Sequence, residues 1–161
     1  MEIYLLRHAI AVMEKYPNDD RPLSKEGIEK MERAAKGMKN IINGIDVLLS
    51  SPLMRANATA SIVAQAINYN KKILITPFLL PDAAPKLLIA FLSKYKTKKS
   101  IMLVGHEPHM SKTASALLGS QTTIFEMKKG ALCRIDIPEP SQTKTGTLIF
   151  HCPPKILREL A

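Results

Sequence analysis

The chain has 161 residues and a mass of 17.8 kDa, so we expect a single domain that spans residues 1–161. Apolar residues make up 46% of the sequence and charged residues 23%, which excludes a disordered or fibrous protein. The apolar runs are far shorter than the roughly 20 residues of a membrane-spanning helix, and no basic segment precedes the first run. We therefore expect no membrane association, no secretory signal and a cytoplasmic location.

The charge of the chain points to anionic partners. Lys and Arg number 23 against 14 Asp and Glu, which gives a net charge of +9. The lysines are dispersed, and the sequence has no Trp and no aromatic residues interleaved with its basic clusters. We therefore expect nonspecific attraction of phosphate groups but no specific nucleic-acid partner. The two cysteines are too few for a disulfide framework.

Strands and helices are predicted to alternate along the first half of the chain. The apolar run 3–6 is typical of a buried strand, and 47–50 of a second one. Ser24 can cap a helix between them, whose inner face would carry Ile28, Met31, Ala35, Met38 and Ile42. A second helix is expected over 54–67.

The second half continues the alternation and then changes. Residues 73–75 and 100–104 are predicted strands, separated by a helix over 87–94 that Pro85 opens. Another helix should begin at Pro108. The segments 131–137 and 146–151 alternate like a β-hairpin joined by a connection rich in Pro, Ser, Thr and Gly. The pattern predicts an α/β sandwich with a mostly parallel sheet.

Candidate functional residues follow three of the predicted strands. Arg7 and His8 come after the first, Ser51 through Arg55 after the second, and His106 after the strand 100–104. Ligands of open α/β sheets bind outside the carboxyl ends of the strands, so these side chains are expected to meet.

Two arginines and two histidines in one pocket suit phosphoryl transfer. An Arg guanidinium matches phosphate oxygens with two parallel hydrogen bonds. A neutral imidazole can attack phosphorus and form a covalent phosphoimidazole, which divides one difficult step into two easier ones. Neighbouring cations lower the pKa of that imidazole and favour its neutral form. A second imidazole can stabilise charge on the oxygens of the transferred group.

Three segments resemble the motifs of the histidine phosphatase superfamily, the phosphoglycerate-mutase-like enzymes. They are Leu-Leu-Arg-His-Ala at 5–9, Ser-Ser-Pro-Leu-Met-Arg-Ala-x-x-Thr-Ala at 50–60 and Val-Gly-His-Glu-Pro at 104–108. The short chain, the Ala after the Arg-His pair and the segment Arg-Pro-Leu-Ser at 21–24 are similar to SixA-type phosphohistidine phosphatases.

The resemblance implies a three-layer α/β/α sandwich and a phosphatase that needs no cofactor. It implies that His8 is the nucleophile, that Arg7 and Arg55 bind the phosphoryl group, and that His106 completes the pocket. Arg21 is expected to contact phosphate or substrate. The implied product is inorganic phosphate, and a monomer is the default expectation.

The general acid is the position at which the sequence departs from the wider family. Only Asp82 and Glu107 are candidates for the group that would protonate an alkoxide leaving group. Phosphohistidine releases an imidazole, whose conjugate acid has a pKa near ~6.5, and so it demands less acid catalysis than an ester. We therefore expect hydrolysis of a P–N bond, with a phosphohistidine-bearing phosphotransfer protein as the partner.

Two other functions remain as alternatives: a phosphatase of a small phosphorylated metabolite, and a phospho-binding regulatory module with little chemistry. A metal site is not expected, because His106 and His109 lie three residues apart, whereas the zinc protease helix places its histidines four apart. We expect both His109 and His151 to be structural.

Overall fold

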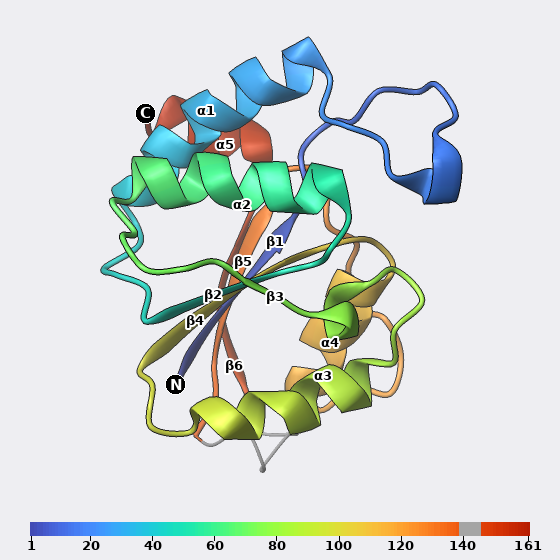
Figure 1. Ribbon diagram of the computed structural model, residues 1–161. Coiled ribbons are helices and arrows are strands. Elements are labelled where there is room, and N and C mark those ends of the chain that lie inside the picture. Colours follow the sequence, from blue (N-terminus) through green and yellow to red (C-terminus); the bar gives the residue numbers. More distant parts are fainter. Residues whose placement is uncertain (139–145) are drawn as a thin grey trace.

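The computed structural model describes residues 1–138 and 146–161, in which a six-stranded sheet lies between two layers of helices (Figure 1). The strands are β1 (Glu2–Arg7), β2 (Val47–Ser50), β3 (Leu74–Ile75), β4 (Ser100–Gly105), β5 (Leu132–Asp136) and β6 (Thr147–Cys152). Their order is β3-β2-β4-β1-β5-β6, and the first four are parallel while β5 and β6 run antiparallel. The predicted sandwich with a mostly parallel sheet is confirmed.

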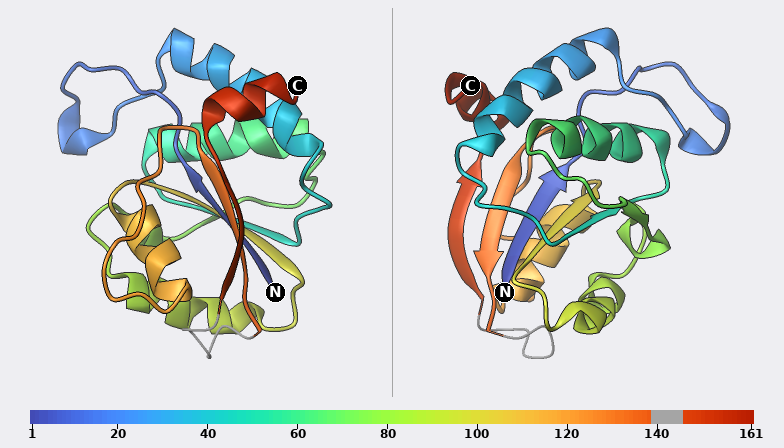
Figure 2. Two further views of the ribbon diagram at one scale, coloured as in Figure 1. Left: turned by 180° about the vertical axis from the view of Figure 1, so that it is seen from behind. Right: turned by 60° about the vertical axis from the view of Figure 1, so that its left-hand side comes forward.

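Helices cover both faces of the sheet. The helices α1 (Lys25–Lys39), α2 (Met54–Ala66) and α5 (Pro154–Glu159) pack on one face, and α3 (Pro85–Leu92) and α4 (His109–Leu117) on the other (Figures 1 and 2). Short 3-10 turns lie at Pro17–Asp19, Pro77–Leu79 and Ser93–Tyr95. None of the helices in the described residues combines the length and the apolar character that crossing a membrane requires.

The central strands are buried on both faces, which explains their uninterrupted apolar sequences. In β1, Tyr4 and Leu6 pack under α1 and α2, while Ile3 and Leu5 pack against the side of α3 and α4. All four side chains are fully buried. Two cores therefore hold the sheet rigidly from both sides and fix the positions of its strand ends.

Helix α1 begins as predicted but does not bury every predicted residue. The Gly27 N–H donates to the Ser24 hydroxyl (3.0 Å), the expected cap. Ile28 is 39% exposed, so the prediction that it faces the core is wrong. Gly37 lets α5 approach closely, because a Cβ atom there would lie 1.8 Å from the Leu157 carbonyl oxygen.

Two further differences concern the ends of helices and the last element. The helix expected at 87–94 is α3, which begins at Pro85 and ends at Leu92, where a 3-10 turn follows. The helix α5 was not predicted, because a helix of six residues, the first of which is a proline, gives little periodicity. The hairpin of β5 and β6 is confirmed, while its predicted connection falls on residues 139–145, outside the described residues.

Candidate active site

The topology brings the predicted residues to one edge of the sheet. Strand β4 lies between β1 and β2, and the helices that follow β1 and β2 pack on the face opposite to α4 (Figure 1). The chain therefore leaves neighbouring strand ends in opposite directions and opens a crevice, the usual ligand site of such sheets. The His8 N–H donates to the Gly105 carbonyl (3.0 Å) and the Ser51 N–H to the Val104 carbonyl (3.0 Å), which tie the three loops together.

His8 is held with one ring nitrogen engaged by the backbone. Its Nδ1 lies 2.7 Å from the Ala9 carbonyl oxygen, which can only accept, so Nδ1 carries the hydrogen. The Nε2 atom is then unprotonated and accepts from Arg55 Nε at 3.3 Å. Burial, together with the charges of Arg55, Arg7 and Lys129, lowers the pKa of His8 to about 3. The ring is therefore neutral at physiological pH, with the lone pair of Nε2 available.

Arg55 comes from the first turn of α2 and is 3% exposed. One of its terminal nitrogens donates to the Asp19 carbonyl, and the other to Asp19 Oδ2 at 3.0 Å. Asn18 and Asp19 both adopt left-handed backbone conformations (φ 56° and 55°), which Asn and Asp tolerate better than most residues. This turn presents both the carbonyl and the carboxylate of Asp19 to one guanidinium.

His106 faces His8 across the crevice. The ring centroids lie 5.0 Å apart, and His106 Nε2 is 2.8 Å from the Ser51 hydroxyl oxygen. Its Nδ1 has no hydrogen-bond partner among the described residues, although it is buried. Burial, then the nearby His8 and Arg55, lower the pKa of His106 to about 2. The site thus holds two neutral imidazoles, one of them with a free polar nitrogen.

Arg7 has lost part of its hydration without gaining a full set of partners. Its Nη1 donates to the Met127 carbonyl (2.6 Å), but its buried Nε has no partner in the described parts of the chain. Burial lowers the pKa of Arg7 from its usual value, opposed by Glu107 and Glu126. A half-buried guanidinium with a buried, unsatisfied N–H is suited to an anionic ligand.

Arg21 lies outside the group formed by His8, Arg55 and His106, and it is linked to that group through Asp19. Its Nε donates to Asp19 Oδ1 (2.8 Å) and its Nη1 to the Val12 carbonyl (3.3 Å). Arg21 therefore contacts His8 only through Asp19 and Arg55. Its contact with phosphate or substrate stays a prediction.

The two candidate acids lie in different settings. Both carboxylate oxygens of Glu107 accept hydrogen bonds, one from the Ser111 hydroxyl and the other from the Met127 N–H at 3.2 Å. Asp82 lies in the turn before α3, and its charge acts on His109, whose pKa burial lowers to about 4.

Ser51, which lies in the predicted segment 51–55, contacts His106. Two polar residues that the sequence did not predict as functional also support the site: Asp19 holds Arg55, and Thr59 accepts from the Ala9 N–H (3.0 Å) while donating to the Arg55 carbonyl (2.7 Å). Thr59 belongs to the quoted motif, which could have drawn attention to it. Asp19 has no such signal. In residues 1–138 and 146–161, no group of three or more His, Cys, Asp or Glu side chains could hold a metal ion.

Known proteins share the sequence pattern and the fold. Residues 3–79 match the family model of the histidine phosphatase superfamily (branch 1). An uncharacterised protein of Picosynechococcus sp. is 31% identical over 126 residues, 76% of each chain. The phosphohistidine phosphatase SixA of Escherichia coli is 24% identical over 124 residues, 76% of this chain and 77% of SixA.

Solved structures agree with these matches. The structure of SixA complexed with tungstate superposes with a TM-score of 0.87 at 23% identity and covers 98% of this chain and 99% of its own. A putative alpha-ribazole-5'-P phosphatase of Escherichia coli has a TM-score of 0.72 at 21% identity, with 96% and 98% covered. The chain therefore belongs to the histidine phosphatase superfamily (branch 1) and has the phosphoglycerate-mutase-like fold of its SixA-type members.

Proposed function

We propose that this phosphatase hydrolyses phosphohistidine on a phosphotransfer protein through a covalent phosphohistidine on His8. One observation carries the proposal: the Nδ1 hydrogen of His8 is donated to the Ala9 carbonyl (2.7 Å), which leaves the Nε2 lone pair beside the Arg55 guanidinium. A neutral, oriented imidazole next to a buried cation is what attack on an anionic phosphorus centre requires.

The first step transfers the phosphoryl group to the enzyme. The Nε2 lone pair of His8 forms a bond to phosphorus while the P–N bond breaks in a phosphohistidine that is protonated on its other ring nitrogen. The electron pair of the broken bond returns to the leaving nitrogen, so that a neutral imidazole departs. The Ala9 carbonyl, which accepts from Nδ1–H, stabilises the positive charge that His8 gains. Arg55 and Arg7 bind the phosphoryl oxygens, as two guanidiniums can do with parallel hydrogen bonds.

The second step regenerates the enzyme. Water attacks phosphorus, the N–P bond to His8 breaks, and its electron pair returns to Nε2, so that inorganic phosphate and a proton are released. The Ser51 hydroxyl receives the Leu53 N–H (3.3 Å) and can donate its own hydrogen to His106 Nε2 (2.8 Å). The ring hydrogen of His106 is then on Nδ1, which donates to a phosphoryl oxygen as charge gathers there.

The surroundings of Glu107 favour a P–N substrate over an ester. An ester releases an alkoxide, which needs a proton from a general acid, whereas phosphohistidine can take a proton from solvent on its other ring nitrogen near neutral pH and then releases a neutral imidazole. One oxygen of Glu107 accepts a hydrogen bond from the Ser111 hydroxyl and the other from the Met127 N–H. This carboxylate therefore holds the loop after β4 in place. Asp82 lies in the turn before α3, where its charge raises the pKa of His109 against the larger effect of burial.

The test compares three substrates at matched concentrations: a histidine-phosphorylated phosphotransfer domain, a phosphoserine peptide and a simple phosphate monoester. We expect the phosphotransfer domain to release phosphate fastest. The variant His8→Ala should lose this activity and should no longer trap labelled phosphate in an acid-labile, base-stable form. His151→Ala, which removes a histidine that stacks on Phe125 outside the site, is the matched control and should keep it.

Faster turnover of the monoester would overturn the phosphohistidine assignment. A small phosphorylated metabolite would then be the substrate, and Asp82→Asn and Glu107→Gln would be the variants that identify the acid. Tight phosphate binding without turnover of any of the three substrates would indicate a phospho-binding module.

A further inference from the structure

A basic cavity of about 600 Å³ lies beside Arg7, on the face of the sheet that α1 and α5 cover. Its walls come from the end of β1, from α1, from the turn 128–130 before β5 and from the start of α5. Among the described residues, no Asp or Glu lines it, whereas six cationic side chains do: Arg7, Lys30, Lys128, Lys129, Lys155 and Arg158. His8, Arg55 and His106 do not line it, so the cavity is distinct from the crevice in which they meet.

Most of these positive charges have no carboxylate partner among the described residues. Lys30 forms an ion pair with Glu26 one turn earlier in α1. The other five have no carboxylate within 4.0 Å in the parts of the chain that the structure describes. Cations brought together in one cavity repel each other, and this repulsion is relieved when an anionic group binds among them.

The cavity is lined by apolar as well as basic side chains. Met31 and Ala34 contribute from α1, and Pro153 and Pro154 from the start of α5. Free phosphate or a small polyanion gains little from the apolar lining. An acidic segment of polypeptide can use both kinds of lining, because its carboxylates meet the basic side chains while its backbone and aliphatic atoms cover the apolar ones.

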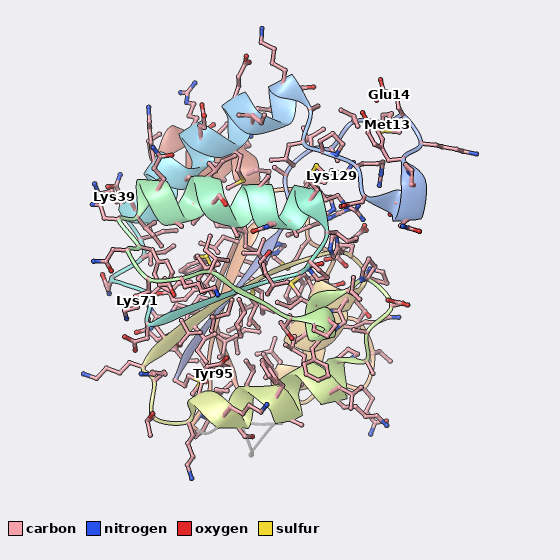
Figure 3. The ribbon with its side chains drawn as sticks, viewed as in Figure 1. Met13, Glu14, Lys39, Lys71, Tyr95 and Lys129 are labelled. Atoms are coloured by element: carbon pink, nitrogen blue, oxygen red, sulfur yellow. The ribbon has the colours of Figure 1, made fainter. Side chains whose placement is uncertain are left out.

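The cavity and the candidate active site are electrostatically connected. Arg7 lines the cavity and directly precedes His8, and the charge of Lys129 is one of the causes that lower the pKa of His8. Figure 3 places Lys129 at the end of the sheet where β1 ends. A ligand that spans the distance from His8 to the turn 128–130 would thus occupy both sites.

We propose that this cavity binds an acidic segment of the phosphoprotein substrate and thereby selects which protein is presented to His8. This inference rests on the proposed function, since it names how the substrate of that reaction is recognised. The volume lies in the range of roughly 300–1,000 Å³ that is usual for ligand pockets and accommodates several side chains.

The test removes three cations that lie outside the catalytic machinery, in the variant Lys128→Gln/Lys155→Gln/Arg158→Gln. The control variant Lys72→Gln/Lys96→Gln/Lys98→Gln removes the same charge. Its Lys96 and Lys98 lie beside Glu2, at the opposite end of β1. The substrates are a histidine-phosphorylated phosphotransfer domain with acidic residues beside its phosphohistidine, the same domain with those residues neutralised, and phosphoramidate.

We expect the cavity variant to raise KM for the acidic domain by about tenfold, roughly twofold for each cation, with kcat unchanged. Turnover of phosphoramidate, and of the neutralised domain, should change by less than about twofold, since neither can use the cavity. The control variant should behave as wild type. An equal rise in KM in both variants would show that net charge alone attracts the substrate, and this result, or no rise at all, would overturn the inference.

A binding measurement distinguishes failure of this inference from failure of the proposed function. If wild type does not hydrolyse the phosphorylated domain, the proposed function fails, but calorimetry with the unphosphorylated acidic domain still decides the role of the cavity. Weaker binding by the cavity variant than by the control supports it. If the cavity variant loses binding of tripolyphosphate but retains that of the acidic domain, the occupant is a small polyanion and the inference is wrong.

Discussion

Three buried histidines make the stability of this fold sensitive to acid. His8, His106 and His109 are 6%, 1% and 1% exposed, and burial lowers their pKa values to about 3, about 2 and about 4. In the unfolded chain each has a pKa near ~6.5, so the unfolded state binds more protons once the pH falls below that value. The stabilisation is complete above pH ~6.5 and is lost as the pH falls toward the folded-state values.

The size of the effect follows from these pKa values. As the pH falls from ~7.5 to ~5, the free energy of unfolding decreases by about 2 kcal/mol for each histidine that stays neutral in the folded state. The three together should lower it by about 6 kcal/mol, which is comparable with the total stability of many domains. In the variant His8→Gln, one titrating group is removed, so the loss over the same range should be about 2 kcal/mol smaller than in wild type. The pKa of His151 is also lowered by burial, and its contribution is the same in both proteins.

Urea unfolding, followed by circular dichroism at several pH values between ~7.5 and ~5, measures this loss. The readout is the change of the free energy of unfolding with pH, which is independent of any constant effect of the substitution. Lys72→Gln, on an exposed side chain, is the control and should show the wild-type dependence. Asp19 and Asp46, whose pKa values are lowered by nearby Arg and backbone N–H groups, titrate below this range. A flat profile, or the same slope in His8→Gln as in wild type, would refute the reasoning.

Three further substitutions test the packing and the site. Gly37→Ala places a methyl group 1.8 Å from the Leu157 carbonyl oxygen, so thermal unfolding should show a loss of about 3 kcal/mol, against little change for the exposed Lys36→Ala in the same helix. Arg55→Lys keeps a charge but loses the planar fork, and kcat/KM should fall by about 100-fold or more while the folded spectrum is retained. Thr59→Val leaves the buried Ala9 N–H without its acceptor and should cost about 1–3 kcal/mol on denaturant unfolding, whereas Thr59→Ser should remain close to wild type.

The central sheet and the meeting of the site residues could be predicted from sequence for a physical reason. Strands buried on both faces must be apolar throughout, so 3–6, 47–50 and 100–104 stand out as runs that no amphipathic helix would give. Parallel strands also place their carboxyl ends at one edge. The residues that follow those runs, Arg7, His8, Arg55 and His106, therefore had to converge.

The parts that escaped prediction depend on contacts between distant segments. Asp19 lies in an irregular loop with no periodicity, and its role arises only because Arg55, 36 residues later, reaches it. Helix α5 is short and depends on docking against α1 at Gly37. Ile28 fits the helical period, but the face it belongs to is decided by what packs against the first turn of α1, and the sequence does not contain that information.

The contacts of the two site arginines assign them different parts in binding a dianion. Asp19 pairs with Arg55 and holds the plane of its guanidinium, and the Arg55 Nε donor points at His8 Nε2, the atom that we propose attacks phosphorus. We therefore expect Arg55 to orient the phosphoryl group at little reorganisation cost, because a phosphoryl oxygen can replace the His8 lone pair as its acceptor. Arg7 has no carboxylate partner within 4.0 Å among the described residues and keeps an unsatisfied buried N–H. We therefore expect Arg7 to form new hydrogen bonds to the phosphoryl group, and Arg7 also lines the basic cavity.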